Sequence, residues 1–184
     1  MIKLKALFIK HVLNLNDGGG TNINDALLEA VNVVKNVRAS ESMPSNIKPM
    51  IIFLTDGEAT QGITSNSQIL KNMKEANHDV KIPIYGLAFG SGADFNLIKS
   101  IGTESGAFSR RIYEASDAAI QLEDFYAEIS SPLLTHVKFD YVGGNFKKTT
   151  VSKLNTFFRG SEYVVAGKLV VDDVQGHELN EELE

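Results

Sequence analysis

Two short apolar runs, separated by a segment with helical periodicity, set the first limit on how this chain of 184 residues can fold. Residues 50–54 are entered from Pro49 and stopped by Asp56, and residues 82–89 end at Gly90. Uninterrupted apolar runs of this length are typical of strands buried on both faces of a parallel sheet. We therefore expect two central strands.

The segments before, between and after these runs carry apolar residues at helical spacing. This spacing predicts an early amphipathic helix over residues 4–15, carried by Leu4, Phe8, Val12 and Leu15. It also predicts a second helix after Thr21, running to about Ala39 and carried by Ile23, Leu27, Ala30, Val34 and Val37. The same pattern predicts a helix at Ile69, Met73 and Ala76, a short one at 95–101 ended by Gly102 or Gly106, a strand at 108–113 and a helix at 115–129. Parallel strands need crossover connections, so this alternation predicts an α/β fold with helices on both faces of the sheet.

The pattern changes after Ser131. Val137, Phe139 and Tyr141 alternate with polar residues, as in an antiparallel strand with one solvated face. A glycine pair at 143–144 ends that strand, a further strand is expected over 163–171, and the acidic residues 178–184 are expected to fray. We therefore predict an α/β domain over 1–131 and a β-rich segment over 132–184.

Composition excludes several classes of partner. The net charge is −5, whereas binding to nucleic-acid phosphates requires clustered Lys and Arg that outweigh the acids. The apolar stretch at 4–15 contains Lys5, Lys10 and His11, which argues against a membrane span. The chain has no cysteine, so it has no disulfide and no thiolate metal ligand. We expect neither nucleic acid nor membrane as a partner.

Two polar loops follow core elements at positions where parallel sheets bind ligands. One is Gly18-Gly19-Gly20-Thr21-Asn22, and the other is Thr55-Asp56-Gly57-Glu58. The Thr21 hydroxyl and the Asp56 carboxylate are hard oxygen donors that could fill part of the coordination shell of Mg²⁺. Spacing alone leaves open that Thr21 is only a helix cap and Asp56 only a turn former.

Residues 17–24, Asp-Gly-Gly-Gly-Thr-Asn-Ile-Asn, and residues 51–58, Ile-Ile-Phe-Leu-Thr-Asp-Gly-Glu, resemble the second and third ligand loops of the von Willebrand factor type A domain. The resemblance implies a partial, doubly wound, Rossmann-like sheet, in which the three predicted strands are strands four to six of the order 3-2-1-4-5-6. It makes Thr21 and Asp56 metal ligands of a metal-ion-dependent adhesion site. The flanking residues of the ligand loops are Gly19, Gly20, Asn22, Gly57 and Glu58, of which Glu58 departs from the commoner aspartate.

The first ligand loop of that family, Asp-x-Ser-x-Ser after the central strand, does not occur here. We therefore expect a fragment whose fourth strand has an unpaired hydrophobic edge, and whose two remaining ligands bind a hydrated cation weakly.

Three further stretches, residues 110–113, 122–134 and 160–167, resemble the inter-alpha-trypsin inhibitor heavy chains. This resemblance implies a secreted, extracellular protein whose signal peptide lies outside this chain. It also implies metal-dependent binding, through Mg²⁺ or another divalent cation, to an acidic group on a protein or matrix partner. Hyaluronan and a protease-inhibitor chain are the partners that the family suggests.

An enzymatic function finds little support in the sequence. Gly90-Ser91-Gly92 lacks the Gly-x-Ser-x-Gly pattern, and no lysine precedes Thr21 as a phosphate-binding loop requires. We expect a non-enzymatic binding module. Two alternatives stay open: a generic A-domain scaffold or adhesion protein, which could be intracellular, and, more distantly, a metal-dependent hydrolase. A signal peptide and a β-sandwich domain upstream would favour the heavy-chain interpretation.

Overall fold

The computed structural model describes residues 9–14, 18–40, 44, 47–114, 117–142, 145–150, 153–158 and 163–170. These residues form two compact units, Met1–Glu114 and Ala115–Glu184, and each unit is described by itself. The predicted domain boundary near Ser131 falls at the end of a helix of the second unit and stays a prediction.

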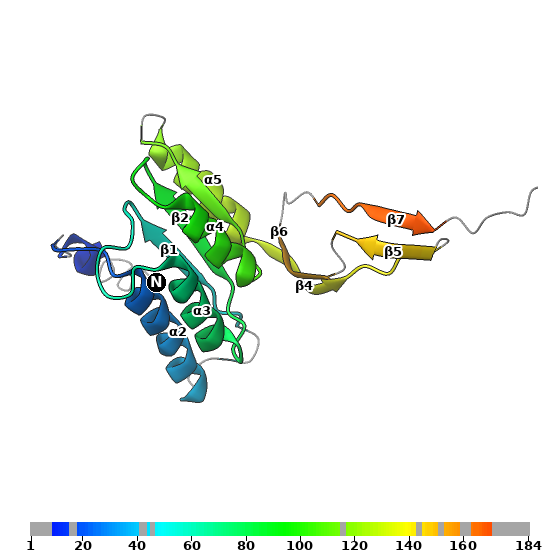
Figure 1. Cartoon of the computed structure of the whole chain (residues 1–184), viewed down its shortest axis with the longest axis horizontal. Coiled ribbons are helices and arrows are strands. Elements are labelled where there is room, and N and C mark those ends of the chain that lie inside the picture. Colours follow the sequence, from blue (N-terminus) through cyan, green and yellow to red (C-terminus); the bar gives the residue numbers. More distant parts are fainter. Residues whose placement is uncertain are drawn as a thin grey trace, which may run out of the picture. The chain divides into compact units, whose positions relative to one another are not determined.

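A parallel sheet forms the centre of the first unit (Figure 1). Its strands lie in the order β1-β2-β3, which is the order that the family resemblance implies. Helix α2 precedes β1, helix α3 connects β1 to β2, and helix α4 connects β2 to β3, so the predicted alternation is confirmed. The bounds are α2 Ile23–Ala39, β1 Ile51–Thr55, α3 Asn66–Asn77, β2 Ile84–Phe89, α4 Phe95–Glu104 and β3 Ser109–Ile112.

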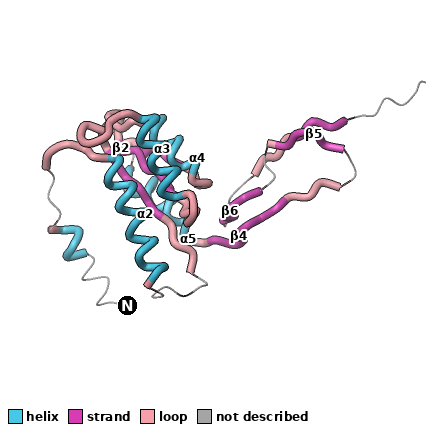
Figure 2. Tube along the Cα trace, turned by 60° about the horizontal axis from the view of Figure 1, so that its bottom comes forward, coloured by secondary structure: helices cyan, strands magenta, loops and turns pink. Residues whose placement is uncertain are grey.

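Helices α2, α3 and α4 lie side by side against one face of this sheet (Figures 1 and 2). Successive residues of a strand point to opposite faces, so Ile51 and Phe53 of β1 join the core on the helix side. Gly86 of β2 lies directly under α4, where a β-carbon would collide with the Ile98 side chain. The fully buried members of this core come from all three helices, from β2 and from the residue Ile82 that precedes it: Ile23, Leu27, Val31, Ile69, Met73, Ile82, Ile84, Ala88, Ile98 and Ile101.

The prediction that the first apolar run is buried on both faces is wrong for the structure described. Ile52 and Leu54, on the pleat away from α2 to α4, keep 48% and 54% of their surface exposed. Within the described residues β1 pairs with β2 alone, so it is an edge strand. The physical reason is that helices α2 to α4 cover only one face of this strand. Its free lateral edge is unpaired within the described residues, as expected.

The helix boundaries refine the sequence predictions. Helix α2 ends at Ala39 as predicted, although Val37 is exposed rather than part of the buried face. Gly102 lies inside α4, and the chain leaves that helix through Gly106, whose φ of +76° favours glycine. Residues 9–13 are helical, with Val12 exposed, whereas Leu4, Phe8 and Leu15 lie outside the described residues.

The described residues of the second unit form a helix and two separate two-stranded antiparallel sheets. The strand predicted from Val137 pairs in one sheet, and Phe139 and Tyr141 follow that strand with their rings stacked. Two of its strands, β5 and β6, were not predicted, because their apolar and polar residues do not alternate regularly. The glycine pair and the acidic end lie outside the described residues. The bounds are α5 Ala118–Ser130, β4 Pro132–Lys138 paired with β6 Lys153–Phe158, and β5 Asn145–Thr149 paired with β7 Gly167–Val170.

Candidate metal-binding site

The loops that follow the three parallel strands meet at the carboxyl edge of the sheet. A β-carbon built on Gly92, after β2, would lie 2.9 Å from the main-chain carbonyl oxygen of Asp56, after β1. A β-carbon on Gly90 would lie 2.5 Å from the carboxylate oxygen Oε1 of Glu114, after β3. This is the edge of an α/β sheet at which ligands bind.

The predicted Thr21 loop is tied to the loop that follows β1. The Thr21 N–H donates to Oγ1 of Thr60 at 2.7 Å, and the N–H groups of Thr60 and Gln61 donate to the Thr21 carbonyl oxygen at 2.9 and 3.1 Å. A β-carbon on Gly57 would lie 3.6 Å from the Thr21 hydroxyl oxygen. The structure therefore brings the Thr21 hydroxyl beside the turn that begins at Asp56.

Thr21 is not the cap of helix α2. The helix begins at Ile23, and the side-chain oxygen of Asn22 accepts a hydrogen bond from the Asp25 N–H at 3.1 Å. Asn22 thus satisfies an N–H group that the helix itself leaves unpaired. Asn22 also faces the loop after β1, because a β-carbon on Gly62 would lie 2.7 Å from its amide nitrogen.

The turn after β1 is held by Thr55 rather than by Asp56. The Gly57 N–H donates to the Thr55 hydroxyl at 3.3 Å, and Thr55 is buried. Asp56 and Glu58 are exposed, and within the described part of the chain no hydrogen bond reaches either carboxylate. The side chain of Thr21 is therefore not required as the helix cap, and that of Asp56 is not required to form the turn.

Two glycines of the first loop are required by its shape. Gly19 has a φ of +79°, a conformation that side chains disfavour. A β-carbon on Gly20 would lie 2.6 Å from both Cγ of Gln61 and Oγ1 of Thr60. The glycines let the Thr21 backbone approach the loop after β1 closely enough to form its hydrogen bonds.

The oxygen donors of Thr21 and Asp56 fit part of the coordination shell of a hard divalent cation. A threonine hydroxyl and an exposed carboxylate are oxygen ligands of the type that Mg²⁺ binds, with water filling the other positions. The described residues contain no group of three or more His, Asp or Glu side chains that could hold a metal by themselves. Thr21 and Asp56 would therefore act as two ligands among several.

Sequence reasoning missed Thr60, Gln61 and Glu114. Thr60 and Gln61 supply the hydrogen bonds to Thr21, and the side chain of Glu114 lies over Gly90. No local signal marks these residues, because Thr60 and Thr21 are 39 positions apart and meet only through the fold.

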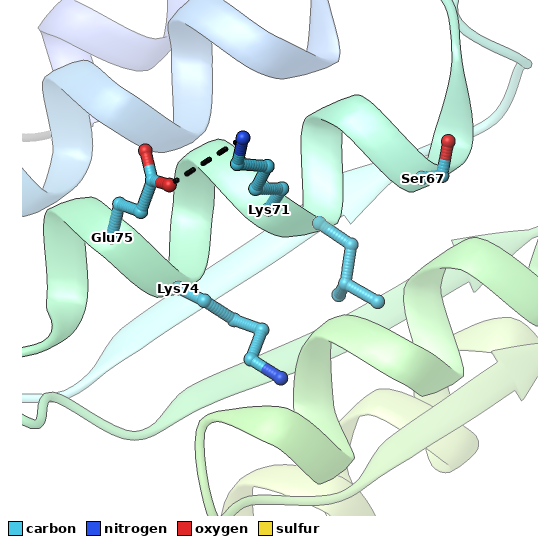
Figure 3. A pocket seen from close by; sticks show the side chains of 5 residues that line it. Ser67, Lys71, Lys74 and Glu75 are labelled. Carbon is cyan, nitrogen blue, oxygen red and sulfur yellow. Dashed lines mark ion pairs between the residues drawn. The ribbon is translucent and has the colours of Figure 1, made fainter.

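A hollow on the surface of α3 contains none of the predicted site residues (Figure 3). It measures about 370 Å³ and is lined by Ser67, Leu70, Lys71, Lys74 and Glu75. Lys71 lies 3.9 Å from Glu75, and Lys74 lies 2.7 Å from Glu104 of α4. Carboxylates therefore balance both lysines, and the hollow has no excess positive charge that would attract an anion.

Asp94 is a carboxylate with a structural role near the same end of the sheet. It caps α4, because its side chain accepts a hydrogen bond from the Leu97 N–H at 3.0 Å. That hydrogen bond holds the pKa of Asp94 below its ordinary value, and the Asn66 amide contributes in the same direction. Asp94 is thus already engaged by protein donors.

Comparison with known proteins connects this geometry to a family. The sequence profile of the von Willebrand factor type A domain matches residues 3–128. Pig inter-alpha-trypsin inhibitor heavy chain H4 is 44% identical over 82% of this chain and 16% of its own length. Rat heavy chain H3 is 39% identical over 90% of this chain and 19% of its own length, and human H3 is 37% identical over 94% and 20%.

The chain thus spans about a fifth, or less, of the length of the curated relatives that it matches. Among the described residues, no helix has the length and apolar character needed to cross a membrane. The resemblance drawn from the two ligand loops and the later motifs is confirmed. The chain belongs to the von Willebrand factor type A domain family, and over most of its length it is similar to the inter-alpha-trypsin inhibitor heavy chains.

Proposed function

We propose that this chain is part of a non-enzymatic binding module, in which Thr21 and Asp56 help to hold a divalent cation that recognises an acidic group on a partner. The observation that supports this most directly is the position of the Thr21 hydroxyl beside the turn that begins at Asp56. Asn22 and Thr55 perform the capping and turn functions that would otherwise explain these two residues.

The charges of the two ligands favour an anionic partner. A divalent cation bound by one carboxylate and one neutral hydroxyl keeps a net positive charge, and the remaining coordination positions are open to water or to another oxygen ligand. When bound, the cation would supply an electrophilic position that a carboxylate on a partner can complete. The residues of this chain would position the cation, and the glycines at 18–20 would let Thr21 reach it.

The wider setting of the module is also part of this proposal. The relatives carry the name of inter-alpha-trypsin inhibitor heavy chains, which favours association of the longer protein with a protease-inhibitor chain. We place that longer protein outside the cell as a secreted component. An extracellular protein or a matrix component such as hyaluronan would then be its partner.

Paramagnetic NMR with Mn²⁺ tests the cation site directly, because Mn²⁺ broadens signals near its binding position even when binding is weak. We expect the amide signals of Thr21, Asp56 and Gly57 to broaden first in the 184-residue chain. Asp56→Asn should abolish this selective broadening, since it removes the charged ligand. Thr21→Val should weaken it, and excess Mg²⁺ should reverse it by competition.

Asp79→Asn provides the matched control, because it makes the same charge change at an exposed aspartate that pairs with His78 elsewhere in the unit. It should leave the broadening unchanged. Equal effects of the Asp56 and Asp79 substitutions, or broadening that spares the residues around Thr21 and Asp56, would contradict the proposal. Partner binding that persists in a metal chelator would instead support the generic scaffold alternative.

A further inference from the structure

The hydroxyl group of Thr60 is the acceptor for the backbone of Thr21. Its Oγ1 accepts the Thr21 N–H at 2.7 Å, while the Thr60 N–H donates to the Thr21 carbonyl oxygen at 2.9 Å. Both polar groups of the Thr21 backbone are therefore held by one residue of the loop after β1. The Gln61 N–H adds a second donor to the same carbonyl at 3.1 Å.

We propose that Thr60 is a positioning residue for the cation site, whose hydroxyl fixes the backbone of Thr21 so that the Thr21 side chain stays beside the Asp56 turn. This inference rests on the proposed function of Thr21 and Asp56. In this scheme Thr60 acts on the cation through Thr21, because its oxygen accepts the hydrogen bond from the Thr21 N–H.

Three features of the loop support a role for the hydroxyl in particular. Thr21 lies between Gly20 and the first residues of α2, so glycine on its N-terminal side leaves its orientation weakly restricted. Gly20 has no room for a side chain because Thr60 Oγ1 occupies that space. Thr60 is itself solvent-exposed, so its side chain contributes little to the core, and its hydroxyl makes its hydrogen bond with Thr21.

The test compares Thr60→Val, which keeps the shape and removes the hydroxyl, with Thr60→Ser, which keeps the hydroxyl. Thr64→Val is the matched control, because it removes the same hydroxyl from an exposed residue of the same loop, whereas the Thr21 backbone is bonded to Thr60 and Gln61. Amide hydrogen exchange at Thr21 is measured without metal, and Mn²⁺ affinity is measured by the NMR broadening described above. Urea denaturation of each variant verifies that it is folded.

We expect Thr60→Val to speed exchange at the Thr21 amide by about 5-fold, the equivalent of one ordinary hydrogen bond, and to weaken Mn²⁺ binding by about 2-fold to 10-fold. Thr60→Ser should restore both quantities to within about 2-fold of the unaltered chain, and Thr64→Val should change neither.

Two results would overturn the inference while leaving the cation site intact: Mn²⁺ binding by Thr60→Val equal to that of the unaltered chain, or a serine variant as impaired as the valine variant. If the unaltered chain shows no Mn²⁺ binding near Thr21, the proposed function fails and this inference fails with it. Exchange at the Thr21 amide then still reports whether Thr60 holds the loop.

Discussion

Replacing Gly20 with alanine would separate the two loops that bring Thr21 to the Asp56 turn. The new β-carbon would lie 2.6 Å from Thr60 Oγ1 and from Gln61 Cγ, well inside van der Waals contact. The hydroxyl of Thr60 would have to turn away, although it accepts the Thr21 N–H at 2.7 Å. The loop after β1 would then move from the Thr21 carbonyl.

The size of the effect follows from the hydrogen bonds that would be lost. Three hydrogen bonds join Thr21 to Thr60 and Gln61, and each contributes about 0.5–1.5 kcal/mol net. Because these groups lie near solvent, which replaces part of each lost bond, we take the lower value and expect a loss of about 1.5 kcal/mol. The urea midpoint should fall by about 0.5–1.5 M.

Gly18→Ala is the matched control, since a β-carbon there meets nothing within 4 Å and Gly18 does not have a positive φ. This variant should be neutral, or more stable by about 0.4 kcal/mol through the reduced entropy of its unfolded chain. Urea denaturation would give the two stabilities, and amide exchange at Thr21, Thr60 and Gln61 would locate the change. Indistinguishable stability and exchange in the alanine variants of Gly18 and Gly20 would refute the reasoning.

Four other substitutions test the fold around the site. Leu27→Ala, at a fully buried position, should lower the free energy of unfolding by about 2–5 kcal/mol in urea denaturation. Leu54→Ala, on the exposed pleat of β1, should lower it by less than about 1 kcal/mol. Equal losses in the two variants would contradict the exposure of Leu54. Gly86→Ala should cost about 1–3 kcal/mol in the same assay, because its β-carbon would collide with a side chain of α4, and a neutral result would contradict that close approach. Asp94→Ala should cost about 1 kcal/mol at pH 7 through the loss of the α4 cap. Because the folded-state pKa of Asp94 is lowered, the stabilisation is present above about pH 4 and is lost as the pH falls through the folded pKa, so the unaltered chain and this variant should converge in denaturation at low pH.

The order of elements in the first unit could be predicted from the sequence because its signals are local. The apolar spacing of α2 and its end at Ala39 agree with the structure, and the two apolar runs became neighbouring parallel strands. The loop residues around Thr21 and Asp56 could also be located, because glycine runs and an Asp-Gly pair mark chain turns. Gly102 and Gly106 could not be distinguished, since only the packing of α4 against β3 shows which glycine ends the helix.

The second unit shows where local signals become too weak. Strand β5 has a single apolar residue, and the apolar residues of β6 do not alternate with polar ones, so their pairing with β7 and β4 depends on partners far along the chain. The pattern that marked Val137 as a strand residue had no equivalent in those segments.

The sequence by itself determined the α/β class, the positions of the two loops predicted to carry ligands, and the family, because periodicity, turn residues and motifs are properties of neighbouring residues. Tertiary structure decided that Asn22 rather than Thr21 caps α2, that Ile52 and Leu54 lie on an exposed pleat, and that Thr60 holds Thr21. The last two depend on which distant groups meet when the sheet assembles, whereas the Asn22 cap is a local hydrogen bond from the Asp25 N–H. Hydrogen bonding and burial between such groups are set by chain geometry that no local pattern encodes.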